Sequence, residues 1–445
     1  MAANSAPMKP LQVGLIGFGT VGRGTWDVLL RNAEEITRRA GRPIRITWIG
    51  TRTLDRAREG ARGITDVQFT ADANVVTRHP DIAIVCELIG GIEPARTLVL
   101  DAIAHGKHVV TANKALLAEH GNEIFAAAHA KGVMVAFEGA VAGGVPIIKA
   151  LREGLTANRI DWIAGIINGT SNFILSTMRE SGTSFESALK EAQARGYAEA
   201  DPTFDVDGID AAHKLTIMSA IAFGVPMQFD KVYTEGISKL TGEDIRYAEE
   251  LGYRIKLLGI TRRTPAGIEL RVHPTLIPAK RLIANVEGVM NAVLVKGDAV
   301  GATMYYGAGA GAEPTASAVI ADLVDVTRMH TSDPENRVPH LAFQPDRLSD
   351  TPFLPMGEVE TSYYLRMRVQ DKPGVLADIT RILADREISI NAMIQKEPSE
   401  GEKQTDIILL THTCIEKDVI AAIAKIEALA TVDGKVVRIR LEELS

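Results

Sequence analysis

The stretch Leu11-Gln-Val-Gly-Leu-Ile16, followed at once by Gly17-Phe-Gly-Thr-Val-Gly22, decides the fold of the N-terminal part of the chain. The apolar residues at 11–16 predict a short buried strand, and the spacing after it predicts a helix from position 21 to about position 39. A strand, a G-x-G-x-x-G motif and a helix in this order are typical of a dinucleotide-binding fold. A plain glycine turn is the alternative. Cofactor contacts are expected at Gly17, Phe18, Gly19, Thr20, Val21 and Gly22.

Strands and helices alternate after this motif. Strands are predicted at residues 44–49, 82–88, 109–111 and 133–137, and helices at 93–105 and 115–130. This order predicts an α/β fold with a Rossmann-type, doubly wound parallel sheet. We expect the nucleotide domain at residues 1–140. A late glycine-rich run leads into a helix predicted at 315–328, so residues from about 305 to 330 would complete this domain.

Length and composition narrow the class of protein. A chain of 445 residues is long enough for about three domains. The net charge of −7 argues against a nucleic-acid partner, which needs a clustered basic surface. Cys86 and Cys414 cannot build a disulfide framework, which fits a reducing compartment. No apolar run approaches the ~18 residues of a membrane helix, and no signal peptide is expected at residues 1–10. We expect a soluble cytoplasmic protein with no membrane partner.

The end of the second strand bears on which cofactor is bound. NAD-binding proteins usually carry Asp or Glu there, to hold the ribose 2′-hydroxyl. This chain has Arg52 instead, and Asp55 comes too late. A guanidinium suits a 2′-phosphate, so NADP is favoured over NAD. The alternative is that Arg52 is a solvated loop residue.

Two loops after later strands lie where ligands bind in such sheets. Gly90 follows the strand at 82–88 and is expected beside the nicotinamide. Lys114 follows the strand at 109–111 and begins a helix. Position alone leaves Lys114 open between a solvated charge and a contact with cofactor or substrate.

Glu138 precedes a loop of small residues at 139–145. Such a loop can turn sharply enough for its carbonyl oxygens to converge, and a hard cation prefers oxygen ligands. A helix entrance with a structural glutamate is the alternative.

A polar run at residues 168–172 precedes an apolar helix at 173–178. Ser171 or Asn172 could cap this helix, or the run could line a substrate site.

The most informative stretch is residues 196–214. Five carboxylates crowd within twelve positions at the start of an apolar helix, and Lys214 follows Asp210 by four residues. A calcium loop is excluded because the glycine position is wrong and the twelfth-position Glu is absent. A capped helix start with Asp207 as its N-cap remains possible. We favour a site for a cationic small molecule with a lysine placed to give a proton, because uncompensated acids repel one another. The five acids are Glu199, Asp201, Asp205, Asp207 and Asp210.

The C-terminal part begins after a Pro- and Asp-rich linker expected at residues 331–360. Strands at 363–369, 388–394, 405–411 and 435–441 and helices at 375–385 and 415–429 follow. Their order, βαββαβ, is that of a ferredoxin-like domain at residues 361–445. Residues 141–304 would form a separate α+β domain that binds substrate.

Taken together, these motifs resemble the homoserine dehydrogenase family, in its bacterial type with a C-terminal ACT domain. The resemblance implies NAD(P)H-dependent reduction of L-aspartate 4-semialdehyde to L-homoserine, in threonine and methionine biosynthesis. It implies Lys214 as proton donor and Lys114 in catalysis and binding. It places the amino acid on Glu199, Asp205 and Asp210, and we add Asn168, Gly169 and Thr170 to this site. It implies a monovalent cation such as Na⁺ on Glu138 and the carbonyls of Val141, Gly143 and Val145. Gly309 and Glu313 are expected on the cofactor. Ala308 departs from the family, which often has proline there.

The C-terminal residues resemble an ACT ligand site and imply feedback inhibition by threonine. Pure dimerisation is the alternative role for this domain. The resemblance also implies a homodimer or higher homo-oligomer, with the domain at residues 141–304 pairing through its sheet. Another ACT-containing amino-acid dehydrogenase and a non-catalytic sensor of nucleotides and amino acids stay open, although a sensor would not need both lysines. The expected effector residues are Asp371, Gly374, Leu376 and Asn391.

Overall fold

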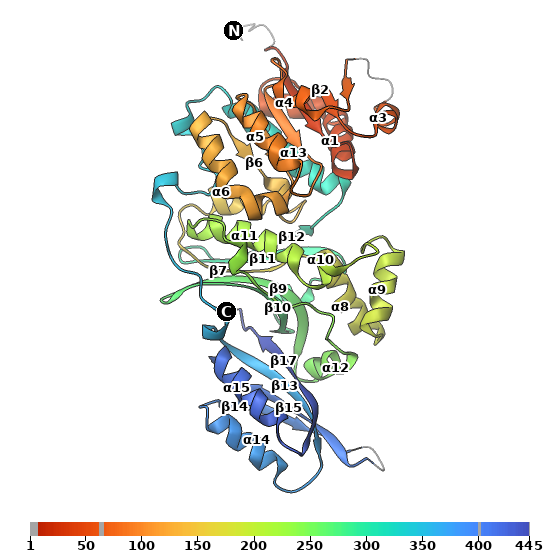
Figure 1. The fold of residues 1–445 in the computed structure, drawn as a ribbon, viewed down its shortest axis with the longest axis vertical. Helices are drawn as coiled ribbons and strands as arrows, with labels where there is room; N and C mark the ends of the chain where they lie inside the picture. The colour runs from red at the N-terminus through yellow and green to blue at the C-terminus, as the bar shows by residue number, and fades with distance from the viewer. Residues whose placement is uncertain (1–7, 62–65, 399–401, 445) are drawn as a thin grey trace. The chain divides into compact units, whose positions relative to one another are not determined.

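The computed structural model describes residues 8–61, 66–398 and 402–444 (Figure 1). The chain forms two compact units, each assembled from separate stretches of sequence. Unit 1 takes Met1–Ile163, Ala212–Asp230 and Met290–Thr351, and unit 2 takes Ala164–Ala211, Lys231–Val289 and Pro352–Ser445. Strand β7 (Ile160–Ile166) and helix α11 (Ile209–Phe223) carry the chain from one unit into the other.

Unit 1 is built around a parallel sheet of the order β3-β2-β1-β4-β5-β6. This is the strand order of a dinucleotide-binding fold, which confirms the predicted Rossmann-type sheet. The ligand edge lies at the carboxyl ends of β1, β4 and β5. The strands are β1 (Leu11–Ile16), β2 (Ile44–Gly50), β3 (Gln68–Thr70), β4 (Ile84–Glu87), β5 (His108–Thr111) and β6 (Val135–Ala136).

The helix predicted at 21–39 is two helices. Asn32, at φ −108° and ψ 19°, ends α1 and precedes α2. The spacing of the apolar side chains continues on both sides of this break, so the sequence pattern alone does not reveal that the helix ends at Asn32. The helices of this part are α1 (Thr20–Arg31), α2 (Ala33–Ala40), α3 (Leu54–Gly60), α4 (Ala73–Arg78), α5 (Ala95–Ala104) and α6 (Lys114–Lys131).

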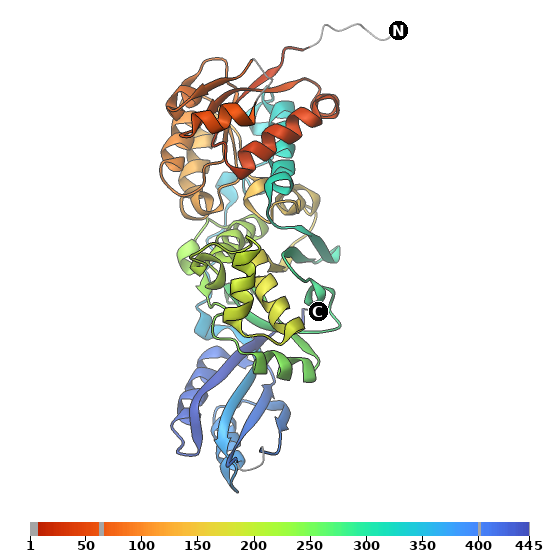
Figure 2. The same ribbon diagram turned by 90° about the vertical axis from the view of Figure 1, so that its right-hand side faces the viewer.

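A helix from far along the chain, α13 (Ala312–Met329), lies beside α1 in both views (Figures 1 and 2). Val319 and Leu323 of α13 share one apolar core with Val13 of β1 and Leu29 of α1. The two helices approach so closely that a Cβ on Gly24 would lie 2.6 Å from the carbonyl oxygen of Ala312. The late glycine-rich run therefore does lead back to the nucleotide-binding sheet.

The remaining elements of unit 1 are short. A 3₁₀ turn (Glu138–Ala140), α7 (Ile147–Lys149) and a π turn (Ala150–Gly154) follow β6. Strands β11 (Met290–Gly297) and β12 (Gly301–Ala308) form an antiparallel hairpin just before α13.

Unit 2 joins a helical layer to a mixed sheet. Its sheet runs β9-β10-β17-β13-β15-β14, and β17 pairs in parallel with β10 through Thr275 with Arg440 and Leu276 with Leu441. Its helices are α8 (Gly169–Ser181), α9 (Phe185–Ala194), α10 (Thr203–Val206), α12 (Gly242–Glu250), α14 (Val375–Ala384) and α15 (Glu416–Glu427). Its strands are β8 (Tyr233–Thr234), β9 (Tyr253–Thr264), β10 (Gly267–Pro278), β13 (Glu360–Gln370), β14 (Ile390–Gln395), β15 (Gln404–Thr411), β16 (Cys414–Ile415) and β17 (Val432–Leu441).

The ferredoxin-like order of the C-terminal part is confirmed, with the two-residue strand β16 added. Helices α14 and α15 pack on one face of its sheet, where Ile379 and Val419 meet Leu365 and Leu409 in a shared core. Between α13 and β13 the structure has only 3₁₀ turns, at Pro334–Asn336, Pro345–Arg347 and Met356–Glu358. None of the helices within the described residues has the length and apolar character that crossing a membrane requires.

Candidate active site

The glycine motif at the carboxyl end of β1 leaves space for a ligand. Gly17 has a φ of 97°, and a Cβ on Gly22 would lie 2.1 Å from the Gly17 carbonyl oxygen, so α1 rests directly on the turn. A Cβ on Gly19, by contrast, would meet nothing within 4 Å. Gly19 is also the N-cap of α1 and offers no side-chain cap to its free N–H groups. An open position at a helix N-terminus is what a pyrophosphate needs, so the cradle fits a dinucleotide.

A buried carboxylate ties together the next two loops of this edge. Oε1 of Glu87 accepts hydrogen bonds from the backbone N–H of Ile89 at 2.9 Å and of Gly90 at 3.2 Å. Oε2 accepts one from the Thr111 hydroxyl at 2.7 Å. Asn113 donates from its side chain to the Gly91 carbonyl oxygen at 2.7 Å. Burial raises the pKa of Glu87. Hydrogen bonds of Glu87 and Asn113 thus connect the loop that contains Gly90 to the loop that precedes Lys114.

Lys114 is the first residue of α6, whose N-cap is Asn113. The side-chain oxygen of Asn113 accepts from the Leu116 N–H at 3.1 Å, which fixes the first turn of the helix and the start of the lysine side chain. Arg52 is exposed in the bend between β2 and α3. Both residues lie at the carboxyl edge of the sheet, as expected, and their roles there stay predictions.

Glu138 is buried, with 2% of its surface exposed, and both of its carboxylate oxygens accept hydrogen bonds from the backbone. They accept from the N–H of Ile148 at 3.0 Å and of Lys149 at 2.8 Å, so the carboxylate caps the start of α7. Asp322 of α13 accepts from the Glu138 N–H at 2.8 Å. Burial and the neighbouring Glu138 raise the pKa of Asp322 to about 7. Within the described ranges, no group of three or more His, Cys, Asp or Glu side chains is arranged to hold a metal.

The expected cation loop lies against the late glycine run. The Gly144 N–H donates to the Ala308 carbonyl oxygen at 2.9 Å. A Cβ on Gly143 would lie 2.7 Å from the carbonyl oxygen of Gly309. Ala308 acts here through its backbone carbonyl, which proline also possesses. Glu313, expected on the cofactor, forms a bidentate pair with Arg31 at 2.8 and 3.0 Å, and both side chains are more than half exposed; its role toward the cofactor stays a prediction.

In unit 2, Asn168 brings two of the five acids together. Its side-chain N–H₂ donates to Asp205 at 2.7 Å and to Asp210 at 2.9 Å. Its side-chain oxygen accepts from the Ser171 N–H at 2.8 Å, which makes Asn168 the N-cap of α8. Ser171 and Asn172, the two residues considered as caps, lie inside the helix, because the cap must precede the first turn and this turn begins at Gly169.

The other three acids of the segment differ from this pair in their exposure to solvent. Glu199, Asp201 and Asp207 are exposed. Asp207 is the C-cap of α10, and α11 begins only at Ile209, so the alternative with Asp207 as N-cap does not hold. Thr170 donates its hydroxyl proton to the Tyr197 carbonyl oxygen at 2.7 Å. A Cβ on Gly169 would lie 2.6 Å from the Val289 carbonyl oxygen, so the start of α8 is tightly packed.

Two lysines of this region are buried. Lys214, with 8% of its surface exposed, lies on α11 four residues after Asp210. Lys256 on β9 is 2% exposed and donates to Asn172, to the Val286 carbonyl oxygen and to Glu287, at 3.1, 2.6 and 3.1 Å. Burial lowers the pKa of Lys256 to about 8. Through Asn172, Lys256 holds the first turn of α8 in place.

The expected effector residues lie in the C-terminal part of unit 2. Asp371 and Gly374 belong to the loop between β13 and α14, where Gly374 has a φ of 95° and precedes the helix. Leu376 is on α14, and Asn391 is on the edge strand β14. A Cβ on Gly374 would meet nothing within 4 Å, so this loop borders open space.

Comparison with known proteins gives the same domain order. Residues 17–138 match the NAD-binding domain of homoserine dehydrogenase, residues 146–324 match homoserine dehydrogenase, and residues 363–431 match the ACT domain. The chain is 64% identical to a homoserine dehydrogenase of Pseudomonas aeruginosa, over 98% of this chain and 100% of that protein. A crystal structure of the enzyme from Thiobacillus denitrificans is 72% identical, with a TM-score of 0.94, and covers 99% of this chain and 100% of that one.

The chain belongs to the homoserine dehydrogenase family. As a homoserine dehydrogenase it is an NAD(P)-dependent oxidoreductase with an ACT domain. It reversibly reduces L-aspartate 4-semialdehyde to L-homoserine, on the route to threonine and methionine. Neither alternative, another ACT-containing dehydrogenase or a non-catalytic sensor, agrees with these matches. A hyperthermophilic archaeal homoserine dehydrogenase in complex with NADPH is 25% identical, with a TM-score of 0.62, and covers 72% of this chain and 98% of that one.

Sequence reasoning missed two residues of this homoserine dehydrogenase that organise its loops. Glu87 ends an otherwise apolar strand, and Lys256 lies in the buried middle of β9. A charge at such a position is costly to bury unless it is paired, so it marks a residue with a specific partner. That signal was available in the sequence, but the identity of the partners was not.

Proposed function

We propose that Lys214 is the general acid of this homoserine dehydrogenase and that Asp205 and Asp210 bind the substrate ammonium. The observation that carries the proposal is the side chain of Asn168, which donates to both carboxylates and so orients them. Since Asp210 and Lys214 are four residues apart on α11, they lie one helical turn apart. An amino acid held by Asp210 would place its aldehyde oxygen within reach of the Lys214 ammonium.

The reaction then divides between cofactor and protein. Bound NAD(P)H supplies the hydride for the aldehyde carbon. Lys214 donates a proton to the aldehyde oxygen as that oxygen gains negative charge, and a positioned acid of this kind typically speeds a reaction about 10²- to 10⁴-fold. Lys114 assists in binding, and Glu199 and Thr170 complete the substrate contacts.

The cofactor is NADPH in preference to NADH. Arg52 follows the strand that usually ends in an acid in NAD-binding proteins, and its guanidinium suits a 2′-phosphate. The NADPH complex of the archaeal relative supports this choice. The remaining cofactor contacts are those of the glycine motif, Gly90, Gly309 and Glu313.

Three further features complete the proposal. A monovalent cation such as Na⁺ binds Glu138 and the carbonyl oxygens of Val141, Gly143 and Val145, using carboxylate lone pairs that the α7 backbone leaves available. Threonine inhibits through Asp371, Gly374, Leu376 and Asn391. The enzyme acts in the cytoplasm as a homodimer or larger homo-oligomer.

Absorbance at the NADPH band during reduction of aspartate semialdehyde, run beside NADH, tests the cofactor assignment. We expect a KM for NADPH well below that for NADH. Arg52→Asp should raise the KM for NADPH by about tenfold or more, as loss of a charge-assisted hydrogen bond does, and should leave the KM for NADH unchanged. Arg45→Asp, an exposed change on the same strand β2, is the control. Equal KM values for the two cofactors would contradict the preference.

A further inference from the structure

Lys256 on β9 is a buried cation whose three N–H groups each have an acceptor. Its Nζ donates to the side-chain oxygen of Asn172 at 3.1 Å, to the carbonyl oxygen of Val286 at 2.6 Å and to Glu287 at 3.1 Å. An ammonium group has three donors and no acceptor, so these partners match the protonated lysine. A neutral amine would have only two donors for the same three acceptors. The complete set of contacts therefore requires the charged form of Lys256.

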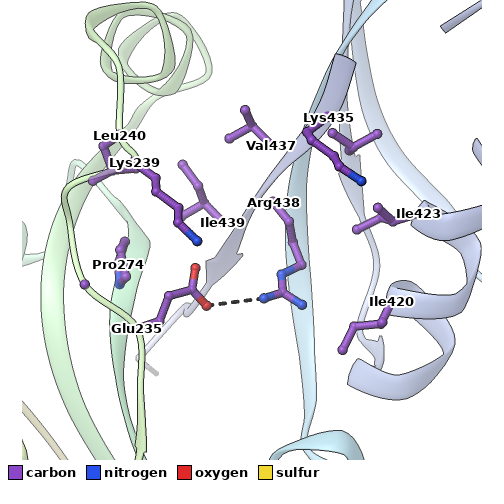
Figure 3. Close-up of a pocket in the computed structure, with 12 residues that line it drawn as sticks. Glu235, Lys239, Leu240, Pro274, Ile420, Ile423, Lys435, Val437, Arg438 and Ile439 are labelled. Atoms are coloured by element: carbon purple, nitrogen blue, oxygen red, sulfur yellow. Dashed lines mark hydrogen bonds and ion pairs between the residues drawn. The ribbon is translucent and has the colours of Figure 1, made fainter. Parts of the chain in front are cut away.

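Little water can reach this group to replace a lost donor. The cavity beside Lys256 has a volume of about 10 Å³, which holds at most about one water molecule. The ion pair of Arg438 with Glu235, at 3.2 Å, instead borders a cavity of about 410 Å³ in the same unit, where water can solvate both groups (Figure 3). Asn172 is 1% exposed, so Lys256 and not bulk water supplies the donor to its side-chain oxygen.

The side chain of Asn172 carries this interaction to helix α8. Its N–H₂ group donates to the carbonyl oxygens of Val286 at 3.1 Å and Gly288 at 3.0 Å. Because Lys256 donates to the other end of the same amide, the orientation of the amide is fixed. One turn further along α8, the Ser176 hydroxyl accepts from the Gly288 N–H at 3.1 Å. The first two turns of α8 are thus attached to the segment that precedes β11.

The first turn of α8 connects Asn172 to two acids. The Asn172 backbone N–H donates to the Asn168 carbonyl oxygen at 3.3 Å. The side chain of Asn168 orients Asp205 and Asp210, and the Ser171 hydroxyl donates to the Asp205 carbonyl oxygen at 3.0 Å. A displacement of this turn would therefore move the donors that align both carboxylates.

We propose that protonated Lys256 is a positioning residue for substrate binding, which holds the first turn of α8 where Asn168 aligns the two acids. The inference rests on the proposed function, in which Asp205 and Asp210 bind the substrate ammonium. Lys256 acts through Asn172 and transfers no proton to the substrate. Its effect is on substrate affinity, and the chemical step remains with Lys214.

The charges around Lys256 determine the pH at which the effect appears. Burial lowers its pKa to about 8, and the carboxylate of Glu287 opposes this shift. As pH rises through this value, Lys256 loses one of its three donors, so the KM for aspartate semialdehyde should rise. The charged groups around Lys256 come from α8, α12, β9 and the segment before β11, and they are Arg179 and Glu180, Glu249, Arg254, and Glu287, respectively.

Steady-state kinetics of the full-length enzyme from about pH 6.5 to about pH 9, with saturating NADPH, tests the proposal. The substrate ammonium titrates alike in every variant, so differences between variants report on the protein. Lys256→Met keeps a long unbranched side chain without the charge. It should raise the KM for aspartate semialdehyde by about tenfold at neutral pH, leave kcat unchanged, and abolish the part of the KM rise that belongs to the wild-type lysine.

A second variant moves the pH dependence without removing Lys256. Glu287→Gln keeps an acceptor but removes the negative charge that favours the ammonium, so the KM rise should shift to lower pH. The matched control is Leu257→Ala, the next residue of β9, whose buried side chain points to the opposite face of the strand. It should lower the unfolding temperature and leave the KM and its pH profile as in the wild type.

The possible failures differ from those of the proposed function. A wild-type KM in Lys256→Met at every pH would overturn the inference, as would a KM rise that stays at the same pH in Glu287→Gln. If Lys256→Met does not fold, the Glu287→Gln profile decides alone. An unchanged KM in Asp210→Asn would instead show that the acidic pair does not bind the substrate ammonium, which refutes the proposed function itself.

Discussion

At the scale of single residues, Lys214 has the most specific predicted role. Replacing it with alanine removes the proposed proton donor but leaves the glycine cradle of unit 1 untouched. Lys214→Ala should therefore lower kcat by about 10²- to 10⁴-fold, with cofactor affinity measured by fluorescence titration unchanged. Lys280→Ala, at an exposed lysine, is the control. A kcat close to that of the wild type would exclude Lys214 as the acid.

His108 makes the stability of the fold depend on pH. It is 8% exposed and accepts from the Met134 N–H at 2.9 Å, and burial lowers its pKa from 6.5 to about 4. Between these pH values the unfolded chain binds a proton that the folded chain does not, so stability falls as pH drops from 6.5 toward 4.

Urea unfolding at about pH 7 and about pH 5 measures this effect. His108→Asn keeps an acceptor near the position of Nδ1 but cannot titrate. Its free energy of unfolding should fall less steeply with decreasing pH than that of the wild type, by up to about 1.4 kcal/mol per pH unit. Parallel pH profiles for the two proteins would show that His108 is not a source of the acid sensitivity.

The roles of single residues could be predicted where the residues belong to a motif in which each position has a known structural reason. Gly17, Gly19 and Gly22 are such a case, because their spacing specifies a turn, an open face and a close contact. Glu87 and Lys256 are the opposite case, because their partners come from other strands and loops. Glu313 shows a third outcome, since its place in a motif did not reveal its pairing with Arg31, 282 positions away.

At the scale of elements, substitutions in the turn between β1 and α1 allow an effect on packing to be distinguished from an effect on ligand binding. Gly22→Ala forces a Cβ against the Gly17 carbonyl oxygen and should cost about 1–3 kcal/mol of stability, as overpacking does. Gly19→Ala adds a methyl group in open space, so its stability should stay within about 0.5 kcal/mol of the wild type. Both should raise the KM for NADPH by about tenfold or more. If Gly19→Ala bound the cofactor normally, the pyrophosphate would not lie over this turn.

The N-cap of helix α8 allows an effect on stability to be distinguished from an effect on substrate binding in the same way. Asn168→Ala removes the N-cap, which costs about 1 kcal/mol, and also removes the donor shared by Asp205 and Asp210. We expect thermal unfolding at lower temperature and a KM for aspartate semialdehyde raised by about tenfold. Ser184→Ala removes the cap of the adjacent helix α9 and should lower stability alone. Equal KM values in the two variants would mean that Asn168 is only a cap.

Helices and strands could be predicted where the spacing of apolar side chains agreed with the turn residues at the ends of the element. The parallel strands and the six C-terminal elements are strongly patterned, and they appear in the structure in the expected order. The hairpin of β9 and β10 was not anticipated. β10 is buried at every residue and β9 along its middle, so no alternation of polar and apolar positions marks the hairpin as a sheet.

At the scale of the whole molecule, the ACT domain should make activity depend on threonine. Titrating threonine into the assay should lower the rate at millimolar concentration. Asn391→Ala should weaken the inhibition without changing the rate in its absence, because Asn391 lies outside the catalytic residues. Met393→Ala, on the same edge strand β14, is the control. A rate that does not change with threonine concentration would favour the alternative that the ACT domain only dimerises.

The sequence indicated three domains in order, and the structure divides the chain differently. Each compact unit collects three separate stretches, because α11 and the β11–β12 hairpin return to the first unit. Such returns depend on which apolar faces meet in the folded state. A local pattern shows that a face exists and does not show what covers it.

The pairing of β17 with β10 means that the ACT domain is not a detachable module. A chain that ended before β13 would bare the edge of β10 at Thr275 and Leu276, and an exposed edge invites pairing with other chains. It would also strip the fully buried Arg271 of its partner Glu442, which lies at 2.6 Å. Truncation should therefore give insoluble protein instead of an unregulated enzyme. Mutants selected for escape from regulation should carry point substitutions, and shortened chains should be absent among them.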